Sequence, residues 1–491
     1  MNKKIKLWVA TLFLFVTTLF TGCTDAFDEI NTDPDAFDSA PYTNMLADAI
    51  REVGTRMGGE IEGYGTWAGY IVKIQYLDYM NGIIPTNNTY GNRWSRCYNN
   101  VYQMSDILDR TEDNAGELKN IRWIARIWQQ YMWLYLLDGW GDIPYSEALK
   151  GGGDDNSILK PKYDSEKDIW PAVMADLKAI ADEMSGGLGD DDIGDGDFIY
   201  AGDVEKWQRF CNSLRLRMAM RLSAVAPELS KSTIEEICGN PSKYPFIDST
   251  DSQCYLWWQG TPPYYEPWYS NKLGRDDHGI SDILIDHLKE MADPRIASIA
   301  HPATSDNEYR GFQNGPESQP QLNMISRIGE IYRDDPAGFT PFYNASESYF
   351  IMAEAALNGW NVGITATEAY EKAVRLSMEE NKIAAADADT YLAGKGKFDN
   401  TKGRIYWEMW VSLFKNNYEG WSLYRRTGYP TTNYPAIESV WKGTHNDMPF
   451  RLPYPNNEEL YNTENCNVAK AGIENYCWGR QLWWDTRTGV K

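Results

Sequence analysis

Aromatic side chains are concentrated in one proline-rich stretch, YLWWQGTPPYYEPWY, at residues 255–269. Rigid aromatic planes lose little conformational entropy on binding, and their faces suit the C–H-rich face of a pyranose ring. These side chains could therefore bind a sugar noncovalently. The aromatic rings would stack on the sugar ring, and nearby polar groups would form hydrogen bonds with its hydroxyl groups. The candidate stacking residues are Trp257, Trp258, Tyr264, Tyr265, Trp268 and Tyr269, and the candidate polar residues are Gln259, Asn271, Lys272 and Arg275.

The prolines of this stretch determine what backbone it can form. Pro262, Pro263 and Pro267 are incompatible with a continuous helix or a central strand, so we predict a stiff loop. The alternative is that the loop packs its rings into a small satellite core beneath itself, and we expect a mixture of the two. Tyr90 and Trp94, in a second loop, are further ligand-binding candidates with the same two interpretations.

The sequence contains no motif for covalent or metal catalysis. GxSxG, HExxH and Walker-type loops are absent, and GKGKF at 394–398 has neither the spacing nor the Ser or Thr of a phosphate loop. The histidines are scattered and no CxxC pair occurs, so we expect no metal and no cofactor. The loop at 186–197, GGLGDDDIGDGD, does not meet the calcium-loop template, and we predict a solvated acidic loop.

A glycoside hydrolase needs only two carboxylates about 5 to 10 Å apart, which an acidic protein can supply. Asp138, Asp142 and Glu147 are the carboxylates to suspect. Asp142 and Glu147, however, lie in a turn, where side chains of this kind cap a helix and close a helix pair. We therefore keep hydrolysis as an alternative and favour binding without catalysis.

The elements that must position these residues are mostly helices, because apolar residues recur at helical spacing along much of the chain. The predicted helices are 45–57, 65–78, 121–137, 169–184 and 207–218, followed by a pair at 349–357 and 370–378. Small alanines at the contact positions of the last two predict an antiparallel, tetratricopeptide-like pair. We predict a mainly all-α fold, with such pairs as scaffold and a large irregular part that bears the ligand.

The N-terminal stretch MNKKIKLWVATLFLFVTTLFTGC has the layout of a secretory signal, with three lysines, an apolar run and then Cys23. The apolar run, residues 7–20, is shorter than the roughly 20 residues that a membrane-spanning helix needs. Its last residues resemble a bacterial lipoprotein box, which predicts a signal peptide at 1–22, a lipidated Cys23 and a body at 23–491. The alternative is a plain signal peptide followed by a coincidental cysteine.

The net charge narrows the possible partners, and the cysteine content narrows the possible disulfides. The formal net charge of −23 repels phosphate backbones, so we do not expect a nucleic acid partner. Seven irregularly spaced cysteines are too few for a disulfide scaffold of this length. Cys466 and Cys477 form either a local disulfide or a pair of buried free thiols.

Several stretches, in chain order, resemble the SusD/RagB family of outer-membrane lipoproteins, in its divergent SusD-like branch. They are NTDPDAF at 31–37, WGDIPYSEA at 140–148, KWQRFCNSLRLRMAMR at 206–221, ESYFIMAEAALNGW at 347–360, EGWSLYRRTGYP at 419–430, RLPYPNNE at 451–458 and WWDT at 483–486. Each stretch alone is a weak signal. The ordered set, together with the lipoprotein box, is specific.

The resemblance implies a lipid-anchored protein of the cell outer membrane that faces the exterior. It implies binding of a glycan, or of another oligomeric nutrient such as a peptide, and delivery of that ligand to a SusC-like TonB-dependent transporter. It also implies that the protein is not an enzyme. The alternatives are a helical glycoside hydrolase acting on the same substrates and a ligand-free interaction scaffold, and the sequence leaves the identity of the ligand open.

Overall fold

The computed structural model describes residues 40–58, 60–77, 90–152, 157–314, 318–432, 445 and 447–490. The chain divides into two compact units, 1–41 and 42–491, and the architecture below is that of the second. The predicted signal peptide, Cys23 and the motif at 31–37 lie outside the described residues. In the described part of the chain, no helix combines the length and the apolar character needed to cross a membrane.

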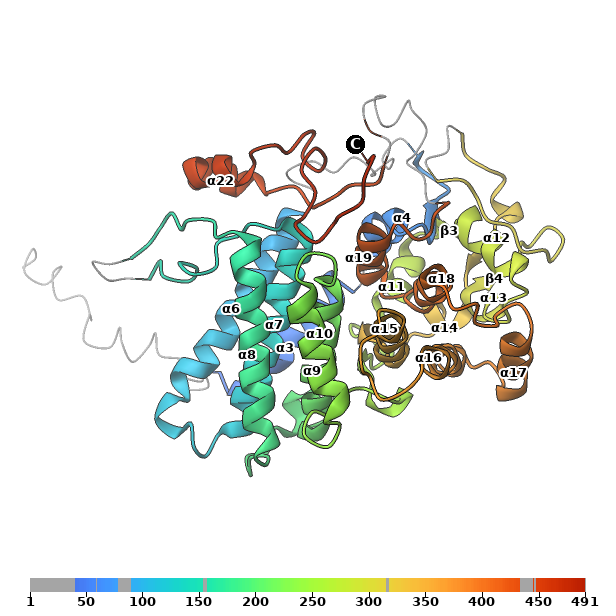
Figure 1. Cartoon of the computed structure of the whole chain (residues 1–491). Coiled ribbons are helices and arrows are strands. Elements are labelled where there is room, and N and C mark those ends of the chain that lie inside the picture. Colours follow the sequence, from blue (N-terminus) through green and yellow to red (C-terminus); the bar gives the residue numbers. More distant parts are fainter. Residues whose placement is uncertain are drawn as a thin grey trace, which may run out of the picture. The chain divides into compact units, whose positions relative to one another are not determined.

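Except for the short helix Gly63–Trp67, which packs against Asn417–Thr427 of the C-terminal half, the helices of the N-terminal half pack side by side in chain order, each against the next (Figure 1). They are α3 (Tyr42–Arg56), α4 (Gly63–Trp67), α6 (Gly91–Arg110), α7 (Lys119–Trp140), α8 (Glu166–Ser185), α9 (Val204–Arg221) and α10 (Pro227–Gly239). The short 3-10 turns between them are η1 (Glu112–Asn114) and η2 (Gly194–Gly196), and η3 (Thr250–Ser252) follows α10. Helix α7 is buried on nearly all sides between α6, α8 and α9, as its apolar sequence predicts.

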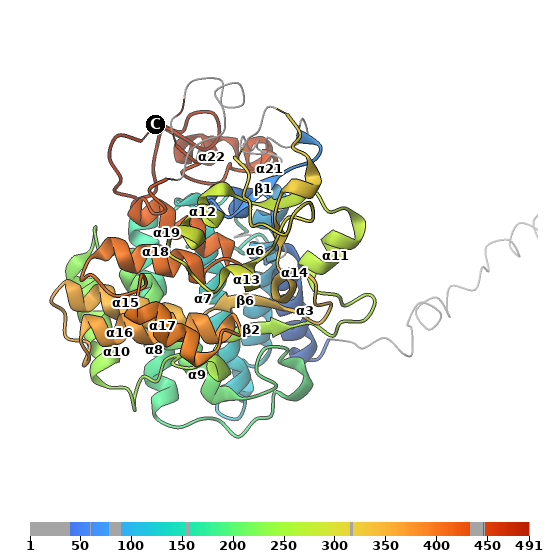
Figure 2. The ribbon, with the colours of Figure 1, turned by 90° about the vertical axis from the view of Figure 1, so that its right-hand side faces the viewer.

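The helices of the C-terminal half join the array through α15, which packs against α9 as well as against α16 and α18 (Figure 2). They are α11 (Pro267–Gly274), α12 (Asp282–Glu290), α13 (Ile296–Ile299), η4 (Leu322–Met324), α14 (Glu330–Arg333), α15 (Ala345–Leu357), α16 (Ala366–Glu380), α17 (Ala385–Ala393), α18 (Lys402–Ser412), α19 (Asn417–Thr427), α21 (Asn456–Tyr461) and α22 (Thr463–Ala469). The pair α15 and α16 confirms the predicted tetratricopeptide-like hairpin, and the fold is mainly helical.

The strands of the described residues form three small antiparallel pairs. They are β1 (Ile71–Lys73) with β3 (His278–Ile280), β2 (Cys254–Trp257) with β6 (Phe339–Tyr343), and β4 (Ala300–His301) with β5 (Arg327–Ile328). The helix predicted at 65–78 is wrong, because α4 ends at Trp67 and β1 follows. Gly69 takes a left-handed conformation that ends the helix, and the β-branched Ile71 and Val72 then pair with β3.

Two carboxylates of the acidic loop at 186–197 form hydrogen bonds that stabilise the neighbouring helices, which the composition of the loop does not indicate. The Asp191 carboxylate accepts hydrogen bonds from the backbone N–H groups of Asn120 and Ile121, at 2.9 and 3.0 Å, and so caps the start of α7. Asp197 is buried and accepts a hydrogen bond from the Trp207 indole at 2.7 Å. The prediction of a solvated loop is therefore wrong for these two carboxylates. No metal-binding cluster occurs among the described residues.

The cysteines resolve one alternative that the sequence leaves open. Cys466 and Cys477 are both free and buried, so they do not form the local disulfide. Burial raises the pKa of the Cys466 thiol to about 11, and it also raises the pKa of Cys477, because an apolar surrounding disfavours the thiolate.

A network of buried charges joins α7, α9, α15 and α19. Arg217 on α9 donates two hydrogen bonds to Glu347, at 2.6 and 2.7 Å, and lies 3.4 Å from Glu419. Arg221, one turn further along α9, pairs with Glu419 and lies 3.2 Å from Asp138 on α7. All five side chains are at most 9% exposed. The network therefore ties the two halves of the helical array together through its core.

Candidate functional site

A cleft of about 390 Å³ lies between α3 and the segment that follows β2, and we call it the aromatic cleft. It is lined by Asn44, Ala47, Asp48, Arg51, Phe198, Leu256, Trp257, Trp258, Gln259 and Tyr264. Three of its rings are substantially exposed, namely Phe198 at 42%, Trp257 at 55% and Tyr264 at 43%. Exposed aromatic rings gathered in a concave surface are typical of ligand sites rather than of a core.

Trp257 is exposed because of its place at the end of β2. The strand buries Cys254, Tyr255 and Leu256 against the body, and Trp257 is the last residue before the chain turns. Its ring lies 5.2 Å from the ring of the buried Phe339 on the paired strand β6. Phe339 therefore supports one side of the Trp257 indole, and the exposed remainder of the indole is free to contact a ligand.

The neighbouring Trp258 contributes a partly exposed ring whose polar end is already engaged. Its indole N–H donates a hydrogen bond to the Thr340 hydroxyl at 3.0 Å, and its backbone N–H donates to the Gly338 carbonyl at 3.0 Å. Both partners belong to the segment that carries β6. Trp258 is thus fixed in orientation and offers the cleft an apolar ring edge.

A tight turn brings Tyr264 back to the cleft. Gly260 has a φ of +71°, and a Cβ there would lie 2.8 Å from the Cβ of Ala337, so only glycine fits. The Tyr264 backbone N–H donates to the Thr261 carbonyl at 2.6 Å, across Pro262 and Pro263. The prolines stiffen this turn, as predicted, and hold the Tyr264 ring beside Trp257 and Trp258.

The rest of the aromatic stretch anchors the turn to the body. Pro267 begins α11, and the Glu266 carboxylate caps that helix by accepting a hydrogen bond from the Tyr269 backbone N–H at 2.7 Å. Glu266 also lies 3.1 Å from the Lys415 amine, in a fully buried pair. Burial raises the pKa of Glu266 and lowers the pKa of Lys415, although each group opposes the shift in its partner.

The polar rim of the cleft is electrically balanced. Asp48 and Arg51 are the charged residues that line it, and they form an ion pair at 2.7 Å. The Asp48 carboxylate also accepts a hydrogen bond from the Gln103 amide of α6 at 3.2 Å. Because these charges satisfy each other, the cleft suits a neutral ligand with hydroxyl groups better than a charged one.

The structure separates the predicted ligand residues into groups. Trp257, Trp258 and Tyr264 meet in the aromatic cleft together with Gln259. Tyr265 and Tyr269 are half-buried and pack against each other at 5.3 Å, outside the residues that line it. Trp94 lines a different cleft, described below. Asn271, Lys272 and Arg275 do not line the aromatic cleft either, and Lys272 pairs with Asp334 at 2.5 Å.

Two of the predicted residues are core residues that line neither the aromatic cleft nor the cleft that Trp94 lines. Trp268 has no exposed surface, and its ring lies beneath the Lys415 amine at 5.1 Å. Tyr90 is 3% exposed and stacks on Tyr64 at 5.6 Å. Neither ring offers a face to a ligand. The predicted stiff loop is confined to the middle of the stretch, because the stretch begins in β2 and ends in α11.

Sequence reasoning missed the α3 wall of the cleft and Phe198. Asn44, Asp48 and Arg51 recur at the spacing of one helix face, but on the sequence they read as the polar side of an amphipathic helix. Phe198 lies six residues before α9, next to an acidic loop. Nothing in the neighbouring sequence indicates that it lines a ligand site. Phe198 and the α3 residues reach the cleft only because the tertiary fold packs them against Trp257, from which they are more than 50 residues away in the sequence.

The carboxylates suspected of hydrolysis do not form a catalytic pair in a cleft. Asp138 has no exposed surface, and burial raises its pKa to about 6. The Asp142 carboxylate accepts a hydrogen bond at 3.0 Å from the backbone N–H of Glu166, the first residue of α8. The Glu147 carboxylate accepts one from the Lys162 backbone N–H at 2.9 Å. The interpretation of Asp142 and Glu147 as capping and closing residues is confirmed.

Comparisons with known proteins agree with this architecture. Residues 37–455 match the family model of SusD-like proteins that is described as "Starch-binding associating with outer membrane". No curated protein matches the sequence significantly. Several solved structures do match in fold.

A chitin-binding protein aligns with 91% of this chain and 100% of its own, at 24% identity and a TM-score of 0.79. A chitin-binding SusD homologue from Flavobacterium johnsoniae aligns with 91% of this chain and 98% of its own, at 23% identity and a TM-score of 0.75. A SusD-like protein from Bacteroides thetaiotaomicron aligns with 92% of this chain and 100% of its own, at 24% identity and a TM-score of 0.77. At these identities the structural likeness establishes the fold.

Proposed function

This chain belongs to the SusD-like family, whose model spans most of its length, and from that premise we propose that it captures a neutral glycan at the cell surface without cleaving it. The observation that carries the proposal is the aromatic cleft, in which Trp257, Tyr264 and Phe198 expose ring faces beside a balanced ion pair. Ring faces supply apolar contact to a sugar, and Gln259 supplies both hydrogen-bond donors and an acceptor.

The two chitin-binding proteins of the same fold, and the description of the family as starch-binding, support a glycan as the ligand class. Delivery of the glycan to a SusC-like TonB-dependent transporter is the second part of the proposal. It is supported by the family's association with the outer membrane. A surface receptor of this kind performs no chemistry, which agrees with the structural duties of Asp142 and Glu147.

We expect the purified chain to bind neutral oligosaccharides and to leave them intact. The test is isothermal calorimetry with N-acetylchito-, malto- and cello-oligosaccharides, followed by chromatography of each sugar after prolonged incubation. Binding with an unchanged oligosaccharide is the expected result. Shortened products would instead identify a hydrolase. Absence of all glycan binding in a folded protein that still co-purifies with an outer-membrane barrel would identify an interaction scaffold.

Attachment through Cys23 is a further part of the proposal, based on the signal layout of residues 1–23. Two acyl chains contribute about 0.8 kcal/mol per buried methylene, which is enough for stable anchoring. We expect Cys23→Ala to move the protein from the membrane fraction to the soluble fraction while its thermal stability stays unchanged. The measurement is fractionation with a carbonate wash. Retention of the variant in the washed membranes would contradict lipidation.

A further inference from the structure

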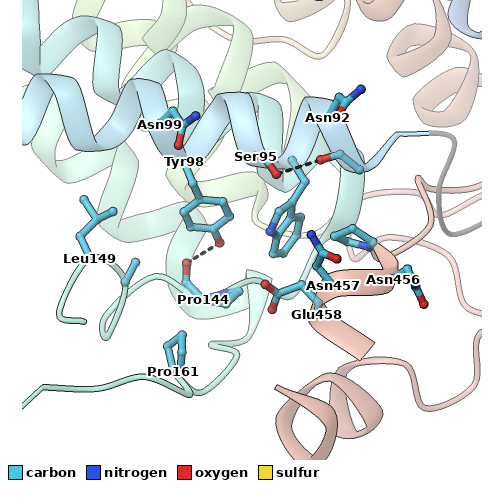
Figure 3. Close-up of a pocket in the computed structure, with 14 residues that line it drawn as sticks. Asn92, Ser95, Tyr98, Asn99, Pro144, Leu149, Pro161, Asn456, Asn457 and Glu458 are labelled. Atoms are coloured by element: carbon cyan, nitrogen blue, oxygen red, sulfur yellow. Dashed lines mark hydrogen bonds between the residues drawn. The ribbon is translucent and has the colours of Figure 1, made fainter. Parts of the chain in front are cut away.

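A second cleft, of about 470 Å³, lies where the start of α6 meets the loop after α7 and the start of α21 (Figure 3). We call it the amide cleft, because Asn92 and Asn99 of α6 and Asn457 of α21 line it. The side-chain amides of these three residues make no hydrogen bond within the part of the chain that the structure describes. They are free to receive a ligand.

The amide cleft has the chemistry of a sugar site. Each primary amide offers two donors and an acceptor oxygen, which can pair with hydroxyl or acetamido groups of either polarity. Glu458 is the one charged residue among those that line the cleft, and its carboxylate is engaged by the Tyr163 hydroxyl at 2.6 Å. The lining therefore presents mainly neutral polar groups, as the aromatic cleft does.

The floor of the amide cleft is held rigidly. The Tyr98 hydroxyl donates to the Pro144 carbonyl at 2.7 Å, which fixes α6 against the loop after α7 (Figure 3). The Tyr98 ring lies 5.0 Å from the ring of the nearly buried Trp94. Asn92 and Asn99 thus lie on a helix whose position is set by packing, so little order has to be gained there on binding.

The two clefts share one helix pair. Asp48 of α3 lines the aromatic cleft and accepts a hydrogen bond from Gln103 of α6. On α6, Asn92 and Asn99 of the amide cleft fall on one face with the 58% exposed Tyr102, at positions seven and ten residues apart. Gln103 and Asn92 are eleven residues apart on this helix, which at 1.5 Å per residue is roughly 16 Å.

We infer that the amide cleft is a second subsite for the same glycan, so that one neutral polysaccharide chain occupies both clefts and crosses the exposed face of α6. The inference rests on the proposed function. Occupying one subsite converts binding at the other into an intramolecular event with a high effective concentration. Affinity therefore depends on chain length, because a disaccharide fills one cleft and a hexasaccharide reaches both.

The test compares N-acetylchitobiose with N-acetylchitohexaose, and maltose with maltohexaose, by calorimetry on the full chain and on the triple variant Asn92→Ala, Asn99→Ala, Asn457→Ala. We expect the hexasaccharide to bind the unmodified chain at least tenfold more tightly than the disaccharide. The triple variant reduces the hexasaccharide affinity to near the disaccharide value and leaves disaccharide binding unchanged. Tyr102→Ala, an exposed substitution that leaves the core intact, weakens the hexasaccharide alone.

Asn114→Ala serves as the matched control, because Asn114 is an exposed asparagine that lines neither cleft. Equal affinities for short and long oligosaccharides, or an unchanged hexasaccharide affinity in the triple variant, would overturn the second subsite and leave the proposed function standing. If neither length binds the unmodified chain, the proposed function itself fails.

Discussion

Glu347→Ala is expected to lower the free energy of unfolding by about 3 to 5 kcal/mol, the usual cost of leaving a buried charge without its partner. Glu347 is 1% exposed and receives two hydrogen bonds from the Arg217 guanidinium, which is itself 3% exposed. Without Glu347, Arg217 keeps a hydrogen bond to the Phe342 carbonyl at 3.0 Å and a longer contact of 3.4 Å with Glu419, which already pairs with Arg221. Arg217 would then have no close carboxylate of its own, because Glu419 and Asp138 both lie nearer to Arg221.

The measurement is urea denaturation of Glu347→Ala beside Asp389→Ala. Asp389 pairs with Arg375 on the surface, with side chains 62% and 43% exposed, and exposed pairs of this kind contribute about 0 to 1 kcal/mol. The double variant Arg217→Met, Glu347→Leu removes both charges and should recover part of the lost stability. A loss of less than 1 kcal/mol in Glu347→Ala would show that water enters the core and solvates Arg217.

This network joins several of the separate stretches of the sequence that resemble one family. Arg217 and Arg221 lie in the motif at 206–221, Glu347 begins the motif at 347–360, and Glu419 begins the motif at 419–430. On the sequence these are only charged residues on helices. Their meeting in the core cannot be predicted from local spacing, because residues up to 202 positions apart have to pack together first.

The helices could be predicted where the sequence has a long apolar stripe at helical spacing, bounded by residues that end a helix. The predictions for α3, α7, α8, α9, α15 and α16 are confirmed, since each has apolar residues at helical spacing over at least three turns. The short elements were not predictable. β1 and β2 have three and four residues, and each is a strand only because a distant strand pairs with it.

For the aromatic cleft, the sequence indicates which segment bears the ligand-binding rings. It does not indicate which of those rings are exposed and which are buried. Composition and prolines pointed to Trp257, Trp258 and Tyr264, which do meet in one cleft. The same aromatic and proline pattern favours Trp268 equally, although α11 turns that ring into the core. The difference comes from the helix that Pro267 and Glu266 begin, whose orientation is fixed by the buried Lys415.

Replacing the exposed rings of the aromatic cleft is expected to give the largest loss of glycan affinity. Trp257→Ala removes a ring whose free face is the largest in the cleft, and Tyr264→Ala removes its neighbour. A stacked aromatic contact and the apolar area it buries together contribute about 1 to 2 kcal/mol, so each substitution should weaken binding roughly tenfold. The double variant should weaken it about a hundredfold, measured by calorimetry with N-acetylchitohexaose and maltohexaose.

Two matched variants separate ligand contact from stability. Tyr461, on α21, is 72% exposed and lines neither cleft, so Tyr461→Ala should leave both affinity and melting temperature unchanged. Trp268→Ala empties a core position and should lower the free energy of unfolding by about 3 to 5 kcal/mol. Because Trp257 and Tyr264 are largely outside the core, their variants should melt close to the unmodified protein. Full affinity in a folded Trp257→Ala, Tyr264→Ala variant would mean that the glycan binds elsewhere on the chain.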